Sequence, residues 1–370
     1  MKILYVTTIG KTMRFFSPFI RLLLDEGHLV ELAANAEGSP VPECYREWGC
    51  KFHQVGFSRS PMSPDNVKAF GQLKKLVEEG EYDIVHCHTP NASVVTRMVC
   101  RKLRKKTGLK VFYTAHGFHF YKGAPVLNWL VFYPIEKFCS FFTDKLITIN
   151  KEDYALAMSK FHSCEVHYVP GVGIDLSRFT DICVDRATKR CEIGVPERAF
   201  LLLSVGELNN NKNHQIVIRA LEKLRNPNVH YAIAGRGDNQ DRLLELTAEL
   251  GVSEQVHLLG YRNDIPELNR AADVFCFPSR REGLGISAIE AMACGLPLIT
   301  SNVHGINDYS ENDISGYKCA PNDIQGFSEA IEKLASNPYL CKKLGEANAL
   351  LAYKYEISTI NQALKNIYES

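Results

Sequence analysis

The sequence alternates short, largely apolar segments with longer segments that have the spacing of amphipathic helices. The apolar segments cover residues 2–7, 29–33, 83–88 and 110–114 in the first half, and 200–205, 230–234, 256–259, 274–277 and 298–300 in the second. Strands that are apolar on both faces indicate a parallel sheet covered by helices on both sides. Their alternation with helices predicts the doubly wound α/β class.

The strand pattern restarts in the second half, so we expect two domains. A length of 370 residues also exceeds what one hydrophobic core usually holds. We expect a junction near residues 171–185, a first domain at 1–175, and a second at 176–352. The last helix, at about 353–370, is expected to pack back on the first domain. In such sheets ligands bind at the carboxyl ends of the strands, so the chemistry should lie in the loops that follow them.

The net charge of +1 hides an uneven distribution. Residues 1–170 carry 22 Lys and Arg against 16 Asp and Glu, whereas residues 171–370 carry 21 against 26. The near-neutral total argues against nucleic acid as a partner. The basic first half is compatible with an anionic surface, although two domains can also differ in charge by chance.

The sequence predicts a cytoplasmic protein. The apolar run at residues 3–8 is short for a signal peptide, and no apolar stretch reaches 18 residues. The 12 cysteines contain no Cys-x-x-Cys pair, and several lie in apolar segments. We therefore expect reduced and mostly buried thiols.

The loop after residues 274–277 carries the most informative pattern. Gly283 and Gly285 precede a helix expected at about 286–294, and they permit close approach of the backbone to a ligand. The free amides at the start of that helix favour an anion. Glu282 in the loop and Glu290 in the helix are suited to sugar hydroxyls, because a carboxylate accepts two hydrogen bonds. The alternative is a plain helix entrance with turn glycines and solvated glutamates.

This pattern resembles a known signature. Glu282-x7-Glu290, with Gly283, Gly285 and the tail Ala291-x-Ala293-x-Gly295-x-Pro297, is similar to the motif of retaining glycosyltransferase family four. Four further segments resemble the family in chain order: Ser204-Val205-Gly206-Glu207 followed by Lys212, Ala234-Gly235-Arg236-Gly237, Leu259-Gly260, and the interdomain run at 169–175. The resemblance implies the GT-B architecture, two Rossmann-like domains facing across a cleft. It is closest to bacterial capsule, exopolysaccharide and O-antigen enzymes, especially at 114–120 and 206–209.

The resemblance implies a role for each matching residue. The catalytic set is Glu282 on the donor sugar, Lys212 on the leaving diphosphate and His116 at the reacting centre. The donor-binding set is Glu290 on the ribose, with Arg236, Gly283, Leu284, Gly285, Ile286, Gly206, Gly235 and Tyr261. The acceptor side, in the first domain, is lined by Gly10, His88 and His119.

The expected reaction moves a sugar from a nucleotide diphosphate sugar, by resemblance a UDP-sugar, to an acceptor hydroxyl with retention of configuration. The expected acceptor is an undecaprenyl-diphosphate-linked saccharide of a bacterial surface polysaccharide. No cofactor and no divalent metal are expected, since the family needs none and no Asp-x-Asp element is present. We interpret His86, His88, His116 and His119 as polar residues that line an acceptor cleft. A metal site of these four histidines is a weaker alternative, because no carboxylate or Cys completes a recognised ligand spacing.

One position departs from the family. An Arg usually shares the diphosphate with the Lys, but Glu207 stands in its place. A carboxylate does not pair with a diphosphate, so we do not assign Glu207 as a phosphate ligand. Arg236 or Arg281 is the candidate for the missing positive charge.

Two features suggest peripheral docking on the inner face of the cytoplasmic membrane. Arg97, Arg101, Lys102, Arg104, Lys105 and Lys106 form the densest basic cluster, and residues 112–142 hold 11 aromatic side chains. Cations near an anionic leaflet contribute about 1 kcal/mol each. A solvated helix face beside an aromatic core is the alternative interpretation.

Other functions stay open at this point. A non-hydrolysing nucleotide-sugar epimerase has the same architecture, and the Glu207 departure keeps a non-catalytic nucleotide-sugar-binding scaffold in consideration. An NAD-dependent dehydrogenase is disfavoured because the full Gly-x-Gly-x-x-Gly fingerprint is absent. An acid–base pair of Glu282 and Glu290, as in glycosidases, is disfavoured because a glutamate within a helix is poorly placed as a mobile base.

Overall fold

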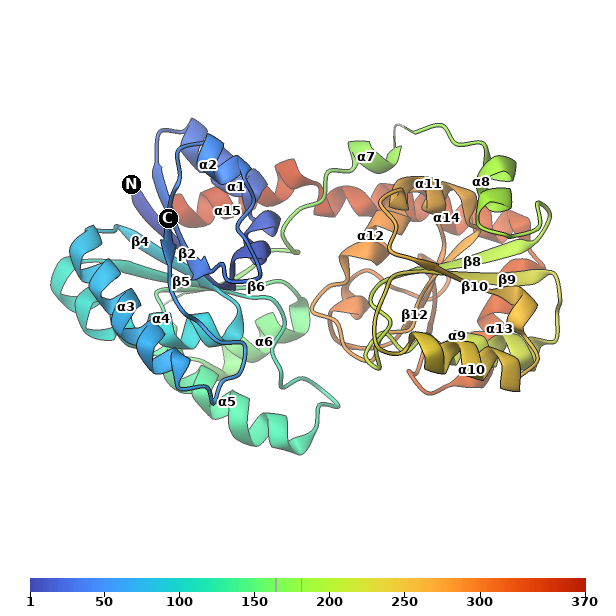
Figure 1. The fold of residues 1–370 in the computed structure, drawn as a ribbon, viewed down its shortest axis with the longest axis horizontal. Coiled ribbons are helices and arrows are strands. Elements are labelled where there is room, and N and C mark those ends of the chain that lie inside the picture. Colours follow the sequence, from blue (N-terminus) through green and yellow to red (C-terminus); the bar gives the residue numbers. More distant parts are fainter. Residues whose placement is uncertain (164, 181) are drawn as a thin grey trace. The chain divides into compact units, whose positions relative to one another are not determined.

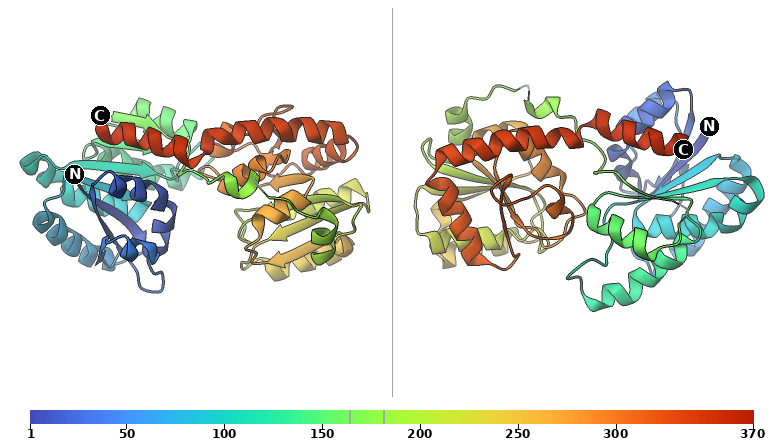
Figure 2. Two further views of the ribbon diagram at one scale, coloured as in Figure 1. Left: turned by 90° about the horizontal axis from the view of Figure 1, so that it is seen from above. Right: turned by 180° about the vertical axis from the view of Figure 1, so that it is seen from behind.

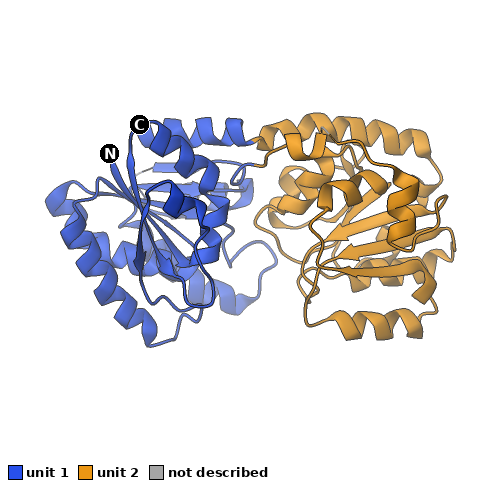
Figure 3. Cartoon of the chain, turned by 45° about the horizontal axis from the view of Figure 1, so that its top comes forward, with its two compact units in different colours: residues 1–173, 357–370 blue, residues 174–356 orange. Residues whose placement is uncertain are grey.

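The computed structural model describes residues 1–163, 165–180 and 182–370, which form two compact units. Unit 1 contains residues 1–173 and 357–370, and unit 2 contains residues 174–356 (Figure 3). The boundary therefore lies between Gly173 and Ile174, within the junction expected at 171–185. Asp181, in the same expected junction, is outside the described residues.

Unit 1 is built on a parallel sheet of seven strands in the order β3-β2-β1-β4-β5-β6-β7 (Figure 1). The strands are β1 (Lys2–Ile9), β2 (Leu29–Asn35), β3 (Lys51–Gln54), β4 (Ile84–His88), β5 (Lys110–Ala115), β6 (Lys145–Thr148) and β7 (Glu165–Tyr168). The helices are η1 (Gly10–Phe15), α1 (Ser17–Asp25), α2 (Cys44–Glu47), α3 (Asp65–Gly80), α4 (Pro90–Thr107), α5 (Val126–Ser140), α6 (Lys151–Lys160) and α15 (Ile357–Glu369).

Helices cover both faces of this sheet because alternate side chains of the central strands are buried on opposite sides. On one face Leu4 and Val6 pack with α3, α4 and α6. On the other face Ile3 and Tyr5 pack with α1 and with Tyr368 of α15. The C-terminal helix, red in Figure 2, therefore completes the core of the unit that contains the N-terminus.

Unit 2 is built on a parallel sheet of six strands in the order β10-β9-β8-β11-β12-β13. The strands are β8 (Phe200–Val205), β9 (Val229–Ala234), β10 (Val256–Gly260), β11 (Val274–Phe277), β12 (Leu298–Ser301) and β13 (Gly316–Cys319). The helices are α7 (Ser177–Thr180), α8 (Arg186–Glu192), α9 (Gln215–Leu224), α10 (Gln240–Glu249), η2 (Ser253–Gln255), α11 (Ile265–Ala271), α12 (Ile286–Ala293), η3 (His304–Asp308), α13 (Ile324–Ala335), α14 (Pro338–Ala352) and η4 (Tyr353–Tyr355).

The predicted α/β class is confirmed, but four strands were missed. β3, β7 and β13 lie at sheet edges and have exposed or half-buried residues, so they lack the apolar run that marks a central strand. β6 is fully buried but begins with Lys145, whose ammonium donates to the Ile367 carbonyl 2.6 Å away.

The cysteines that the structure describes are free thiols. Burial raises the pKa of the Cys87 thiol to about 12, so at neutral pH it is protonated and unreactive. Across the described residues, no helix has both the length and the apolar character needed to cross a membrane.

Candidate functional site

Gly285 is the residue that determines the backbone path at the start of α12. Gly285 caps this helix in the left-handed region, with φ 93° and ψ 71°. A Cβ atom at this position would lie 2.4 Å from the Phe277 ring and 2.9 Å from the Tyr309 hydroxyl. Both the backbone angle and the available space therefore require glycine. The Ala288 amide donates to the Gly285 carbonyl at 3.1 Å, whereas the amides of Ile286 and Ser287 have no acceptor among the described residues and are available to a ligand.

Lys212 and Glu282 meet beside this entrance. Lys212 lies in the loop after β8 and Glu282 in the loop after β11, and these two strands are neighbours in the sheet. The Lys212 ammonium donates to Glu282 Oε1 at 2.6 Å and also lies 4.8 Å from the centre of the Phe277 ring. The two side chains are 20% and 14% exposed, so the pair is partly desolvated but still reachable. The structure thus joins two predicted site residues that are 70 positions apart.

An asparagine that the sequence analysis missed holds these loops together. Asn213 has a left-handed backbone (φ 55°), and its buried side-chain amide donates to the carbonyls of Pro278 and Pro321. It therefore ties the loops after β8, β11 and β13. Asn209 also contributes, because its side chain accepts from the Lys212 backbone amide at 3.0 Å. The run of asparagines around Lys212 is the signal that was available in the sequence, since Asn favours left-handed and loop-capping positions.

Glu290 lies on α12, half-buried, and is not a solvated surface glutamate. Burial raises the pKa of its carboxyl, and the positive charge of Arg178 opposes that shift. The carboxylate is thus costly to keep desolvated and gains from a hydrogen-bond donor such as a hydroxyl.

The loops after β8, β9 and β10 meet at the same sheet edge. The Gly235 amide donates to the Gly260 carbonyl at 2.8 Å, and the Gly206 amide donates to the Ala234 carbonyl at 3.0 Å. A Cβ atom on Gly235 would lie 1.8 Å from the Gly206 carbonyl oxygen, so the backbones touch. Arg236 and Tyr261 are exposed on this edge, with Tyr261 at 66%.

The remaining residues of the predicted donor site differ in whether their side chains are accessible to a ligand. Leu284 is only 5% exposed, so its side chain belongs to the core and only its backbone is available to a ligand. Ile286 is half-buried at the first position of α12. Glu207 is exposed and accepts a hydrogen bond from the Asn209 side chain. Arg281 lies near Lys212 along the loop edge, since its carbonyl accepts from Asn211.

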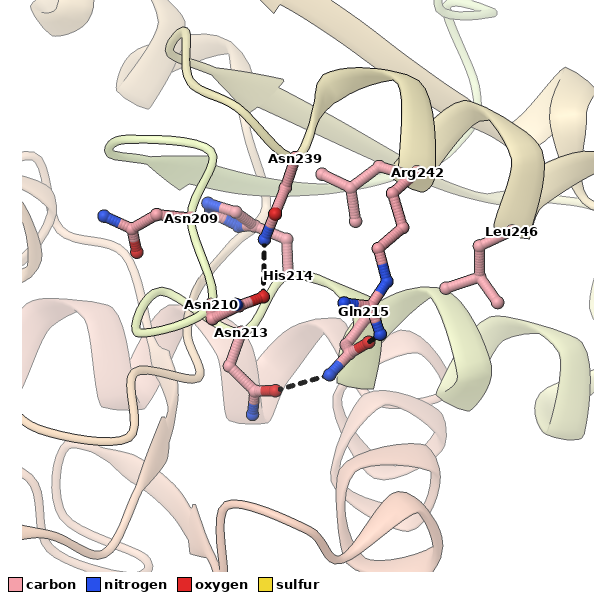
Figure 4. A pocket seen from close by; sticks show the side chains of 9 residues that line it. Asn209, Asn210, Asn213, His214, Gln215, Asn239, Arg242 and Leu246 are labelled. Atoms are coloured by element: carbon pink, nitrogen blue, oxygen red, sulfur yellow. Dashed lines mark hydrogen bonds between the residues drawn. The ribbon is translucent and has the colours of Figure 1, made fainter.

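A small pocket borders the Lys212 loop on the side of α9 and α10 (Figure 4). Its lining is mostly amides, with Asn239 donating to Asn210 at 2.9 Å. The residues are Asn209, Asn210, Asn213, His214, Gln215, Asn239, Arg242, Leu243 and Leu246. These contacts support the loop that carries Lys212.

In unit 1 the structure brings two of the predicted histidines together. His88 ends β4 and His116 follows β5, the neighbouring strand. His88 Nδ1 and His116 Nε2 are 3.2 Å apart. Burial lowers the pKa of His116 to about 4 and lowers that of His88 well below its usual range, so both rings are neutral at neutral pH.

The other predicted first-unit residues lie elsewhere. The centres of the His119 ring and the ring of Phe132, on α5, are 4.8 Å apart. A Cβ atom on Gly10 would lie 2.5 Å from the Ser39 carbonyl oxygen, so packing alone explains this glycine.

His86 is buried and does not line a cleft, which corrects its predicted role. Its Nδ1 lies 2.5 Å from the Tyr368 hydroxyl, and its Nε2 lies 2.8 Å from the Thr114 hydroxyl. Within the described residues, no three His, Cys, Asp or Glu side chains gather as a metal centre would require.

The prediction of which residues form the membrane-facing surface is wrong in part. Arg97 is buried and paired with Glu136 at 2.8 Å, and Arg104 is paired with Asp144, so neither is a freely exposed cation. Among the aromatics, Phe112, Tyr113, Phe118 and Phe120 belong to the core. The exposed cations are Arg101, Lys102, Lys105 and Lys106 of α4.

The outer face of α5 exposes large apolar side chains. Leu127 and Leu130 are each 68% exposed. The full set on α5 and just after it is Val126, Leu127, Leu130, Val131, Ile135, Phe138 and Phe141. The Phe141 carbonyl accepts from Arg104 at 3.3 Å, so the end of this apolar face adjoins the basic end of α4.

Two protein families match the sequence. Residues 2–150 match the family described as Glycosyl transferase 4-like, and residues 185–350 match Glycosyl transferases group 1. The protein named "Putative glycosyltransferase EpsD" of Bacillus subtilis (strain 168) is 35% identical over all of this chain and 96% of its own length. UDP-Gal:alpha-D-GlcNAc-diphosphoundecaprenol alpha-1,3-galactosyltransferase of Escherichia coli is 29% identical over 74% of this chain and 72% of its own.

Solved structures share the fold at lower identity. HepE of Anabaena, crystallised with UDP, has a TM-score of 0.79 at 20% identity, and both chains are covered completely. WaaG, a glycosyltransferase involved in lipopolysaccharide biosynthesis, has a TM-score of 0.76 at 21% identity, with 99% of each chain covered.

Proposed function

Because the chain belongs to the group 1 glycosyltransferases and has the GT-B fold, we propose that it transfers a sugar from a UDP-sugar to a lipid-linked saccharide. The acceptor is a hydroxyl of an undecaprenyl-diphosphate-linked glycan of a bacterial surface polysaccharide. The transfer retains the anomeric configuration.

The contact between Lys212 and Glu282 at the entrance of α12 is the observation that supports this function best. It sets a cation, a carboxylate and free helix amides beside one another at the carboxyl edge of the unit 2 sheet. Departure of a nucleoside diphosphate develops negative charge, which Lys212 and the helix amides stabilise where it forms. Glu282 then accepts hydrogen bonds from sugar hydroxyls, and Glu290 from the ribose. Arg236 adds charge at the neighbouring loop.

Support for the donor and the acceptor comes from relatives. HepE structures hold UDP and UDP-glucose, and the galactosyltransferase of Escherichia coli is named for a UDP-galactose donor and a diphosphoundecaprenol-linked acceptor. A hydroxyl on the acceptor attacks the anomeric carbon on the face that the diphosphate leaves, with His116 hydrogen-bonding at the reacting centre. The bond to the diphosphate breaks, and the hydroxyl proton passes to the departing diphosphate oxygen. Lys212, Arg236 and the α12 amides supply the positive charge that a divalent ion supplies in other transferases.

A donor and acceptor panel tests this function. UDP-sugars are incubated with undecaprenyl-diphosphate-linked saccharides, with and without EDTA, and UDP release and product linkage are followed by chromatography and NMR. We expect UDP only when both substrates are present, an unchanged rate in EDTA, and a product with the donor's anomeric configuration. Isomerisation of the UDP-sugar without acceptor identifies an epimerase instead, and an inverted product contradicts retention.

We further propose that unit 1 docks peripherally on the cytoplasmic face of an anionic membrane through the outer face of α5. Apolar side chains spaced three and four residues apart form one exposed stripe along this helix. The exposed cations at the end of α4 lie next to the stripe and complement anionic lipid headgroups. A lipid-linked acceptor is held at such a surface.

Docking is expected to be lost when the stripe is made polar. In flotation with vesicles of phosphatidylglycerol and phosphatidylethanolamine, the double variant Leu127→Gln/Leu130→Gln should bind about 100-fold more weakly or worse, because each buried leucine contributes about 1.5–3 kcal/mol. Binding should also weaken at high salt.

The control is Leu350→Gln, at a leucine of similar exposure (73%) on α14 of unit 2, and this variant should bind vesicles like the parent protein. Equal binding of the double variant contradicts docking through α5. Loss of self-association in sedimentation, without any vesicle binding by the parent, assigns the stripe to a second copy of the chain.

A further inference from the structure

His88 is held more tightly than a substrate-binding side chain needs to be. It is 2% exposed, and its ring stacks on Phe16 at 4.0 Å and on Tyr5 at 5.3 Å between ring centres. The His86 ring lies 4.2 Å away on a third side. Packing against three other rings therefore fixes the plane of the His88 ring.

The polar contact of His88 is with His116. His88 Nδ1 and His116 Nε2 are 3.2 Å apart, and the other nitrogen of His88, Nε2, is buried without a hydrogen-bond partner among the described residues. Since burial lowers both pKa values, each ring is neutral and carries one N–H. A bond between two ring nitrogens needs one N–H and one lone pair, so two arrangements are possible.

The buried nitrogen decides between them. If His116 donated, His88 would accept at Nδ1 and would have to bury its own N–H at Nε2 without an acceptor. If His88 donates from Nδ1, only a lone pair is buried at Nε2. Orphaned buried N–H groups are rarer in proteins than acceptors without a partner. The second arrangement is therefore favoured, and it leaves His116 with its hydrogen on Nδ1.

We propose that His88 is a positioning residue that donates to His116 Nε2 and fixes His116 as the Nδ1–H form, a hydrogen-bond donor toward substrate. His116 is half-buried, and among the described residues its Nδ1 has no protein partner. A fixed Nδ1–H can therefore bond a hydroxyl oxygen at the reacting centre. The inference rests on the proposed role of His116 in sugar transfer.

His86 differs from His88 although both side chains lie on the same face of β4. Both His86 nitrogens have partners, Tyr368 and Thr114, and neither partner is His116. His86 therefore serves packing between β4, β5 and α15. This difference separates a positioning role for His88 from the general stability of the cluster.

The form of His116 can be observed directly. In the full-length protein labelled with ¹⁵N-histidine, long-range ¹H–¹⁵N spectra distinguish Nδ1–H from Nε2–H imidazole, and His116→Gln identifies the resonance. We expect the Nδ1–H form in the parent protein at neutral pH. In His88→Phe, which fills the same stacked space, we expect the Nε2–H form or a mixture. An Nε2–H ring in the parent protein overturns the proposal.

Kinetics supply the second readout. His88→Phe should lower kcat about 10- to 100-fold with little change in the donor KM, the range seen when an outer partner orienting a functional histidine is lost. His88→Asn places an amide N–H near the position of Nδ1 and should recover most of that loss. Val77→Ala, a buried position on α3, serves as the control matched for loss of Tm and should keep kcat.

The outcomes separate this inference from the proposed function. If His116→Ala keeps full turnover, the catalytic role of His116 fails, while the spectra still report whether His88 fixes its form. If His116→Ala loses turnover but His88→Phe keeps both kcat and the Nδ1–H form, the positioning role of His88 is wrong.

Discussion

Replacing Glu282 with alanine is expected to lower kcat about 100-fold or more, whereas Glu290→Ala should cost far less and act mainly on the donor KM. Glu282 is the carboxylate that contacts Lys212 at 2.6 Å, so its loss removes the proposed sugar ligand and also frees the ammonium that we propose to contact the diphosphate. Losing one preorganised group at a reacting centre typically costs 10²–10³ in kcat. Glu290, on α12, is assigned to the ribose, which does not change during transfer. Steady-state kinetics with saturating acceptor measure both constants.

Two controls sharpen this comparison. Glu282→Gln keeps the shape and one hydrogen-bond acceptor but removes the charge, so its kcat should fall between those of the parent and the alanine variant. Glu245→Ala removes an exposed carboxylate on α10 of the same unit and should leave turnover unchanged. Full activity of Glu282→Ala shows that the site assignment is wrong, and a larger effect at Glu290 reverses the two assigned roles.

The substitution Gly285→Ala, which adds one methyl group, is expected to have the second large effect, on stability and on donor binding. In Gly285→Ala the new Cβ would lie 2.4 Å from the Phe277 ring and 2.9 Å from the Tyr309 hydroxyl, on a backbone with φ 93°. The left-handed conformation alone costs about 1–2 kcal/mol for a non-glycine residue. The clash adds to this cost and moves Phe277, on which Lys212 rests. We expect a lower Tm and donor binding weakened about 100-fold or more, measured by calorimetry with UDP.

Gly251→Ala is the matched control for backbone strain. Gly251 also has a left-handed φ, 69°, but a Cβ there meets nothing within 4 Å. This variant should lose stability through the strain alone and bind UDP like the parent protein. If the two variants lose similar stability and both keep UDP affinity, the packing around Gly285 has no part in the donor site.

The central strands and the entrance of α12 were predictable because their signals are local. A run such as 274–277 is apolar on both faces and is followed at once by its glycine loop. Edge strands such as β3 and β13 contact one neighbour only and are partly exposed, so their sequences carry no such run. Lys145 in β6 looks like a break in a strand until Ile367 supplies its carbonyl.

The contacts within the candidate site were predicted less well than its residues. Lys212 and Glu282 were expected in separate roles, and their ion pair follows from strand order, which one sequence does not display. Arg97 looked like a surface cation, but its partner Glu136 lies 39 residues away on another helix. His86 looked like a cleft residue, because its partner Tyr368 is 282 residues away. Each error concerns a polar group whose partner is distant in the chain.

Because α15 packs in unit 1, the core of unit 1 cannot be completed during synthesis until α15 has been made. The sheet face that includes Tyr5 and His86 is closed by Tyr368 of α15. A ribosome adding about 5–20 residues per second needs roughly 10 to 40 s to make residues 174–370. During that time unit 2 can complete its own core, while the nascent first unit still has an open apolar face. Unit 1 therefore completes its core only after unit 2 has been made, and a product that lacks α15 leaves that face uncovered for chaperones or proteases.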